Sequence, residues 1–349
     1  MRLTVGVTRR GILLAPLLGV TRTALAEEPF DSALIEGARK EGSLTWYTGL
    51  IVNQIARPLA EAFETRFPGV TVRYARASNT DTTLKIVNEA RARRVMADVF
   101  DVTSGIHTLL DARVVAAWPP EPAAGYAPEH RDKDGYWTAS NLYFMTLAYN
   151  TNLIRPEAAP RDFETLADPR WSGKIAWTSE MAITGPPGFI GMVLSVMGEE
   201  AGLAWLKRLA ALKPAALGVS PRAVLDQVIA GEYAIGLQTY NHHAVISAAQ
   251  GAPVDWVKLE PLVGLFSLMG ILKDAPHPNA ARLFVAYALS AEGQKIFAAN
   301  DYLPANPAVA ARVPALKPEA GGFRVHTISP GQARDGLAKW IAIHQEIFR

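Results

Sequence analysis

The sequence predicts an α/β protein that is large enough for two domains. Segments with the apolar pattern of strands alternate with helical segments from residue 33 onward, and parallel strands need helices as crossover connections. The chain has 349 residues, enough for two hydrophobic cores. It contains no cysteine, which excludes disulfides, thiolate metal sites and cysteine nucleophiles.

The N-terminus has the pattern of an export signal. Arg9 and Arg10 precede a short apolar run over Gly11–Val20, and small residues at 24–26 offer a cleavage site. The apolar run is only about half as long as a membrane span, which needs roughly 20 residues. We therefore predict a cleaved signal peptide over residues 1–26 and a periplasmic mature protein. The arginine pair also fits a twin-arginine signal, so the Sec route and the twin-arginine route both stay open.

The charge of the mature chain gives no reason to expect a nucleic-acid partner. The full chain has a formal net charge of +2, and its first 26 residues contain four arginines and no acidic residue. Their removal changes the formal net charge to −2. The basic isoelectric point of the full chain is therefore due to the predicted signal peptide and not to the mature protein. No other apolar run approaches the length of a span, and we expect no membrane insertion of the mature chain.

The first block of elements extends to about residue 102. Apolar residues at helical or alternating spacing indicate the type of each element; Leu59, Ala62 and Phe63, for example, share one side of a helix. The predicted helices cover 33–41, 55–66 and 80–94, and the predicted strands cover 44–47, 70–74 and 99–102.

A second block begins near Ser140. An apolar strand over Val263–Leu272 follows it, and Asn279 is a plausible N-cap of the next helix. The extended segments are expected over 142–149, 175–178 and 233–237, and the helices over 188–196, 199–212, 224–230 and, at the end of the chain, 337–348.

Three segments carry motifs in a fixed order. They are Asp162–Ile175 (DFETLADPRWSGKI), Leu225–Gly236 (LDQVIAGEYAIG) and Gly251–Phe297, which ends in SAEGQKIF. Together they resemble the periplasmic solute-binding proteins of ABC importers, extracellular solute-binding protein family 1, and in particular its ferric-ion-binding branch. Proteins of that family deliver ligands and catalyse no reaction, so the resemblance implies a binding protein and not an enzyme.

The resemblance implies the two-lobed periplasmic-binding-protein fold of type II. Each lobe is expected to be a central, mostly parallel sheet flanked by helices, with the ligand cleft at the hinge. Lobe 1 would comprise residues 27–139 and 264–315, and lobe 2 residues 140–263 and 316–349. The resemblance also implies a monomer without a cofactor, whose partners are a small-molecule ligand and an ABC permease with its ATPase subunits.

Several loops after predicted strands are rich in hydroxyl groups and small residues. Most stand near a helix start, where free N–H groups and the helix dipole favour an anion. The segment Tyr240–His243 also follows a predicted strand. We expect the ligand-binding residues in these segments: Thr48, Ser78, Asn79, Thr103, Ser104, Thr178, Ser179, Tyr240, Asn241 and His242.

The ferric ligands of the family are mostly replaced in this chain. In ferric-binding relatives two adjacent tyrosines, a histidine and a glutamate coordinate Fe(III). Matched by motif, the tyrosine pair falls on Tyr240-Asn241 or Asn241-His242, the histidine on Ile51 and the glutamate on Thr103. At most one of the four ligands is kept, and Fe(III) needs anionic oxygen.

The ligand that this pattern favours is therefore a small organic anion, such as a phosphonate, a sugar phosphate or a carboxylate. The residues that replace the ferric ligands are mostly uncharged and form hydrogen bonds. Arg76 and Arg222 lie near the same loops and are candidate counter-charges.

Other ligands and activities stay open as alternatives. Besides Fe(III), His242 and His243 suit Zn, Ni or Cu. A polyamine or thiamine would need carboxylates and aromatic rings, which Asp101, Glu180 and Trp46 could supply. A secreted hydrolase is a further alternative, but the chain has no G-x-S-x-G, H-E-x-x-H or P-loop motif.

Overall fold

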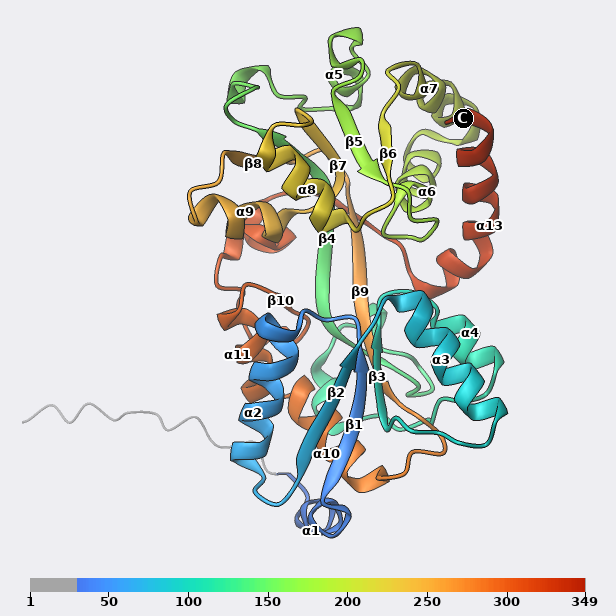
Figure 1. Ribbon diagram of the computed structural model, residues 1–349, viewed down its shortest axis with the longest axis vertical. Helices are drawn as coiled ribbons and strands as arrows, with labels where there is room; N and C mark the ends of the chain where they lie inside the picture. Colours follow the sequence, from blue (N-terminus) through green and yellow to red (C-terminus); the bar gives the residue numbers. More distant parts are fainter. Residues whose placement is uncertain (1–29, 349) are drawn as a thin grey trace, which may run out of the picture.

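The computed structural model describes residues 30–348, and these form two halves arranged along the long axis of the molecule (Figure 1). The predicted signal peptide lies outside the described residues. Two long strands, β4 (Thr138–Asn150) and β9 (Leu262–Ile271), run from one half to the other. All residues of both strands are buried.

The lower half in Figure 1 contains the N-terminal elements and two helices that follow β9. Its elements are α1 (Ser32–Glu41), β1 (Ser43–Thr48), α2 (Arg57–Arg66), β2 (Thr71–Arg76), α3 (Asn79–Arg91), β3 (Val99–Val102), α4 (Ile106–Asp111), α10 (Pro278–Leu289), α11 (Ala291–Ala299) and β10 (Leu303–Pro304).

The upper half contains the middle of the chain and its C-terminal helix. Its elements are α5 (Phe163–Leu166), β5 (Ile175–Thr178), α6 (Pro186–Met197), α7 (Glu199–Ala211), β6 (Ala215–Leu217), α8 (Pro221–Ala230), β7 (Ile235–Tyr240), α9 (Asn241–Ala249), β8 (Val254–Val257) and α13 (Pro330–Ile347). The short elements α12 (Pro318–Gly321) and β11 (Val325–Thr327) lead into α13.

The strands form one continuous sheet in the order β2-β1-β3-β9-β4-β7-β5-β6. Pairing is parallel among β1, β2 and β3 and among β5, β6 and β7, as the alternation of strands and helices predicts. Pairing is antiparallel wherever β4 or β9 contacts these groups. The predicted α/β class and periplasmic-binding-protein architecture are confirmed.

Aromatic clusters form the cores of the two halves. In the lower half Phe63 contacts Phe284, with ring centroids 5.2 Å apart, and Phe284 also contacts Trp46. In the upper half Trp177 contacts Phe348 of the C-terminal segment, with centroids 4.9 Å apart. The chain end therefore packs onto the middle of the chain and helps to close the upper core.

Several element boundaries differ from the sequence prediction. Helix α13 starts at Pro330, seven residues before the predicted start, because Ser329 and Gln332 form a reciprocal capping box. Strand β7 continues to Tyr240, and α9 starts at Asn241. Residues 240–243, expected just after the strand, are therefore its last residue and the first turn of a helix.

Candidate functional site

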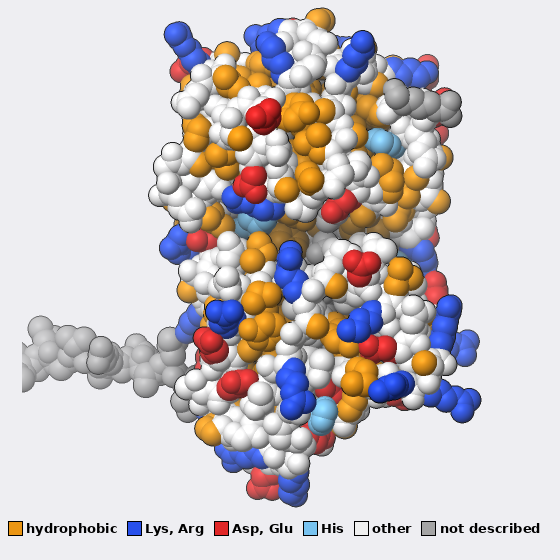
Figure 2. Space-filling model, in the orientation of Figure 1, with side chains coloured by type: hydrophobic (Ala, Val, Ile, Leu, Met, Phe, Trp, Pro, Cys, Tyr) orange, Lys and Arg blue, Asp and Glu red, His pale blue; other side chains and the backbone are white. Residues whose placement is uncertain are grey.

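A cavity of about 720 Å³ lies between the two halves. From the lower half it is lined by the segments after β1, β2 and β3, and from the upper half by the segments after β5, before α8 and after β7. Tyr143 of β4 and Ser267 of β9 also line it. In the space-filling view basic and acidic side chains lie on both sides of the boundary between the halves (Figure 2).

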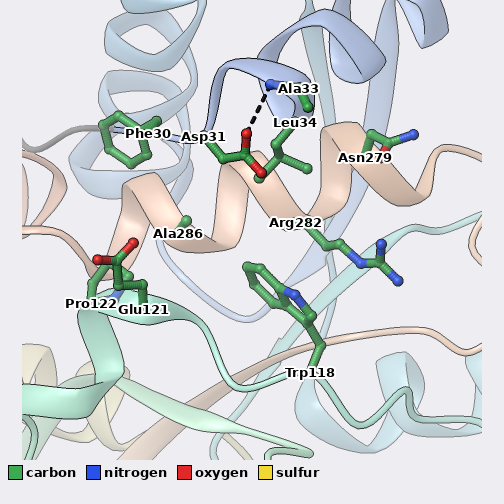
Figure 3. Close-up of a pocket in the computed structure, with 10 residues that line it drawn as sticks. All are labelled: Phe30, Asp31, Ala33, Leu34, Trp118, Glu121, Pro122, Asn279, Arg282 and Ala286. Atoms are coloured by element: carbon green, nitrogen blue, oxygen red, sulfur yellow. Dashed lines mark hydrogen bonds between the residues drawn. The ribbon is translucent and has the colours of Figure 1, made fainter.

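A second cavity, of about 550 Å³, lies beside α1 and α10 of the lower half (Figure 3). Phe30, Leu34 and Trp118 give it apolar walls, and Asp31 accepts the Ala33 N–H at 2.9 Å as the cap of α1. None of its lining residues comes from the upper half. Movement of the halves cannot enclose a ligand there. Of two cavities lined by both halves, the one of about 720 Å³ is larger than that of about 400 Å³ between α4 and α13, and it is the candidate site.

Five of the ten predicted ligand-binding residues line the cavity between the halves. They are Ser78, Asn79, Thr103, Ser104 and Tyr240. Ser78 caps α3, since its hydroxyl accepts the Asp81 N–H at 3.1 Å, and the Asn79 side chain accepts the Thr103 N–H at 2.8 Å. These hydrogen bonds therefore fix the geometry of the loops, and both residues also line the cavity.

The other five predicted residues are not among those lining the cavity, and the protein uses or covers the polar groups of four of them. The Thr48 hydroxyl accepts the Leu50 N–H at 3.0 Å, the Thr178 hydroxyl donates to the Val219 carbonyl at 2.6 Å, and the Asn241 amide donates to the Leu316 carbonyl at 3.0 Å. His242 is fully buried. Ser179 follows β5 but lies outside the lining.

Three phenol side chains line the cavity together, and the sequence analysis identified only one of them. The Tyr143 ring centroid lies 5.0 Å from that of Tyr240 and 6.4 Å from that of Tyr302. The three residues come from β4, β7 and the segment after α11, which are far apart in sequence. Only the pairing of β4 with β7 and β10 could show that these rings meet.

Burial raises the pKa of all three phenols. The pKa of Tyr302 rises to about 12, although the Ile51 N–H bonded to it lowers the value. The pKa values of Tyr143 and Tyr240 also rise because burial disfavours the charged form. At neutral pH these three phenols are therefore protonated.

Two arginines and one glutamate contribute formal charges to the cavity lining. Arg76 donates to the Gly49 carbonyl at 3.3 Å, and Arg222 donates to the Ser247 hydroxyl at 3.0 Å and to Asp226 at 2.8 Å. Burial raises the pKa of Glu180.

Two helices also start at the wall of the cavity, one in each half. They are α3, capped by Ser78, and α8, capped by Ser220. Arginines and helix N-termini both favour an anionic group.

The neighbouring histidines form no evident metal site. Burial, assisted by the charge of Arg222, lowers the pKa of His242 to about 3, and neither ring nitrogen has a hydrogen-bond partner among residues 30–348. His243 lines the cavity, and burial lowers its pKa as well. Residues 30–348 contain no group of three or more His, Cys, Asp or Glu side chains that could hold a metal ion. The Zn, Ni or Cu alternative thus has no support in this geometry.

The fold and the cavity define a solute-binding protein. The chain belongs to the family of bacterial extracellular solute-binding proteins, whose model matches residues 102–320. The predicted family, the extracytoplasmic location and the absence of enzymatic activity are thereby confirmed. In the part of the chain that the structure covers, no helix combines the length and apolarity needed to cross a membrane.

Particular relatives include ferric-binding proteins. The Fe(3+)-binding periplasmic protein of Serratia marcescens is 26% identical over 248 residues, which cover 68% of this chain and 71% of the relative. Iron-bound HitA of Pseudomonas aeruginosa has a TM-score of 0.71 at 24% identity, with 87% of this chain and 99% of HitA covered. AfuA of Actinobacillus pleuropneumoniae, with fructose-6-phosphate bound, has a TM-score of 0.74 at 20% identity, with 88% and 98% covered.

Proposed function

We propose that this chain is the periplasmic subunit of an ABC importer that captures Fe(III) together with a small oxyanion. The observation that carries the proposal is the meeting of Tyr143, Tyr240 and Tyr302 at one cavity. Fe(III) is a hard cation that prefers anionic oxygen, and three phenolates would neutralise its charge. The sequence analysis preferred an organic anion because it counted a single phenol; the S. marcescens relative also favours iron.

A small oxyanion is part of the proposal because of the positive groups around the cavity. A volume of about 720 Å³ exceeds what a bare ion needs, and Arg76 and Arg222 line the same space. The N-termini of α3 and α8 favour an anion as well. A carboxylate bound to the ion would fill the space that the phenols leave and would meet these positive groups.

Capture is proposed to close the hinge between two lobes, with the predicted residue ranges 27–139 and 264–315 in one and 140–263 and 316–349 in the other. The proposed crossings near residues 140 and 264 fall within β4 and β9. A ligand stabilises the closed form only through contacts that are better there. A permease with its ATPase subunits would then accept the closed monomer.

A second candidate ligand is an organic phosphate without metal. The observation that favours it is the pair of arginines between two capped helix N-termini, together with the raised pKa values of the phenols, which oppose ionisation. AfuA shows that the same fold can hold fructose-6-phosphate.

Thermal unfolding of the ligand-free mature protein would distinguish the two candidates. A ligand at 100 times its dissociation constant should stabilise the protein by about 2.7 kcal/mol. We expect that shift with Fe(III)-citrate and not with citrate alone or with fructose 6-phosphate. A shift with fructose 6-phosphate alone would reject the ferric proposal in favour of the second candidate.

A further inference from the structure

The cavity of about 400 Å³ between α4 and α13, called the rear cavity below, lies on the other face of β9 from the candidate site. Ser267 of β9 lines the candidate site, whereas its neighbours Phe266 and Leu268 line the rear cavity. Successive side chains of a strand point to opposite faces. The two cavities are therefore separated by a strand that joins the halves.

Each half supplies one wall of the rear cavity. Ile106 and Thr108 belong to α4 of the lower half, and Leu337 and Ala338 belong to α13 of the upper half. These two helices approach one another across the boundary between the halves, on the right-hand side of Figure 1. A change in the angle between the halves must therefore change the separation of α4 and α13.

Two loops complete the partition between the cavities. Thr103 and Ser104, which follow β3 of the lower half, line both cavities. In the segment after β5 of the upper half, Ile183 lines the rear cavity, while Ala182 and Thr184 line the candidate site. Parts of a rigid body on opposite sides of a hinge axis move in opposite directions. A rotation about this partition that narrows the candidate site therefore widens the rear cavity.

We infer that the contact of α4 with α13 at the rear cavity opposes closure of the candidate site and thereby sets its affinity. The rear cavity has mostly apolar walls, and widening it exposes them to water, which is unfavourable. The apparent affinity of a ligand falls with the fraction of the protein in the binding-competent form. Residues of these walls thus determine affinity without touching the ligand. This inference rests on the proposed hinge closure.

Bulk added to the rear cavity after folding tests this inference. Ala338 is exposed and lines the rear cavity, whereas Ala342, one turn further along α13, is exposed and lies outside the lining. The chain has no cysteine, so Ala338→Cys and Ala342→Cys each provide a single thiol. Alkylation of the folded proteins with iodoacetamide or N-benzyliodoacetamide then attaches a small or a large group at one known position.

A large group on the Ala338→Cys thiol should hold α4 and α13 apart and favour the closed form. We expect the benzyl-labelled variant to bind Fe(III)-citrate about fivefold more tightly than the unlabelled one, and the small label to have less effect. Labelled Ala342→Cys should match the wild type within about twofold. Weaker or unchanged binding by benzyl-labelled Ala338→Cys would overturn the inference.

The opposite wall provides an independent variant. Thr108 is an exposed residue of α4 that lines the rear cavity, so Thr108→Phe adds bulk from the lower half. We expect tighter binding of Fe(III)-citrate here too, because bulk from either wall separates the same two helices. Opposite effects of bulk on the two walls would show that each acts only within its own half, and would overturn the inference.

Coupling between two sites is reciprocal, which gives a second measurement. Ala333 of α13 lines the rear cavity and is half-buried. Saturating Fe(III)-citrate should widen this cavity, so we expect the Ala333→Cys thiol to react about threefold faster with N-benzyliodoacetamide. The Ala342→Cys thiol should react at the same rate with and without ligand. A rate for Ala333→Cys that stays unchanged or falls would overturn the inference.

Failure of the ferric proposal can be told apart from failure of this inference. If the wild type binds no Fe(III), the same comparisons are made with fructose 6-phosphate, and the expected signs stay the same because closure does not depend on the chemistry of the ligand. Contraction of the wild type on binding, without any effect of the label on affinity, would overturn the inference alone. Binding without contraction would overturn the proposed closure and the inference together.

Discussion

At the scale of single residues, the proposed capture of Fe(III) requires phenols that lose their protons. The raised pKa values of Tyr143, Tyr240 and Tyr302 mean that an ion bound by these oxygens would have to displace protons. Affinity for Fe(III) should therefore rise with pH, because fewer protons compete with the ion at higher pH.

Replacing Tyr240 by Phe removes one phenol oxygen and should weaken Fe(III) binding at least about tenfold. The free energy of unfolding should stay within about 0.5 kcal/mol, because the ring and its packing are kept. Tyr233→Phe is the matched control, since Tyr233 lies before the same strand and outside the cavity lining. Calorimetric titration of the three proteins measures the effect; equal affinities would remove Tyr240 from the site.

The buried carboxylate of Asp101 gives a prediction on stability. Its folded pKa of about 6 is raised from 3.8, so the native state keeps a proton that the unfolded chain has lost between these values. Its contribution to stability is therefore fully present below about pH 4 and falls as the pH rises through 6. The free energy of unfolding of Asp101→Asn, relative to that of the wild type, should therefore increase by up to about 3 kcal/mol between pH 4 and pH 7.

Denaturant unfolding of both proteins across this pH range measures that difference. Asp98→Asn replaces another fully buried acid, and we expect a loss of stability at neutral pH. The amide keeps one acceptor oxygen, so one of the two backbone N–H groups bonded to Asp98 loses its acceptor, and the contact with His277 Nδ1 loses its charge. A difference between wild type and Asp101→Asn that does not change with pH would contradict the account of this carboxylate.

At the scale of elements, the C-terminal helix α13 shows how local sequence signals secure the packing. Ser329 and Gln332 form a capping box, and Pro330 occupies the first turn. Trp340 of this helix packs closely on Gly191 of α6, where a Cβ atom would lie 2.6 Å from the indole ring. Docking of α13 therefore needs both a defined start and a glycine on its partner.

Ser329→Ala should lower the free energy of unfolding by about 1 kcal/mol, because the Gln332 N–H loses its acceptor. Ligand affinity should stay unchanged, since Ser329 does not line the cavity between the halves. Denaturant unfolding and a ligand titration on the same sample test both statements. Unchanged stability would show that the cap contributes nothing to the folded state.

The sequence predicted the alternation of strands and helices well, because crossover helices such as α2 and α8 show clear apolar periodicity. It predicted Ser78, Thr103 and Tyr240 at the cavity, because loops after parallel strands gather at one edge. It missed Tyr143 and Tyr302, since their meeting depends on long-range pairing of β4. It expected Asn241 and His242 to bind ligand just after a strand, although both lie in the first turn of α9 and neither lines the cavity.

At the scale of the whole molecule, β4 and β9 would be the structural basis of the proposed hinge closure. They are buried along their whole length and join the two halves beside the cavity. We expect a decrease in the radius of gyration when Fe(III)-citrate binds, measured by small-angle X-ray scattering. No decrease at saturating ligand would argue against closure as the basis of capture.

The most direct test of the central claim is a visible absorption titration of the ligand-free protein with Fe(III)-citrate. Phenolate oxygens bound to Fe(III) give a coloured complex. We therefore predict a visible absorption band that reaches its maximum at one equivalent of Fe(III). The band should weaken in Tyr143→Phe, Tyr240→Phe and Tyr302→Phe and stay unchanged in Tyr233→Phe. Saturable binding without a band, or a band that none of the three substitutions alters, would contradict the proposal that these tyrosines hold the ion.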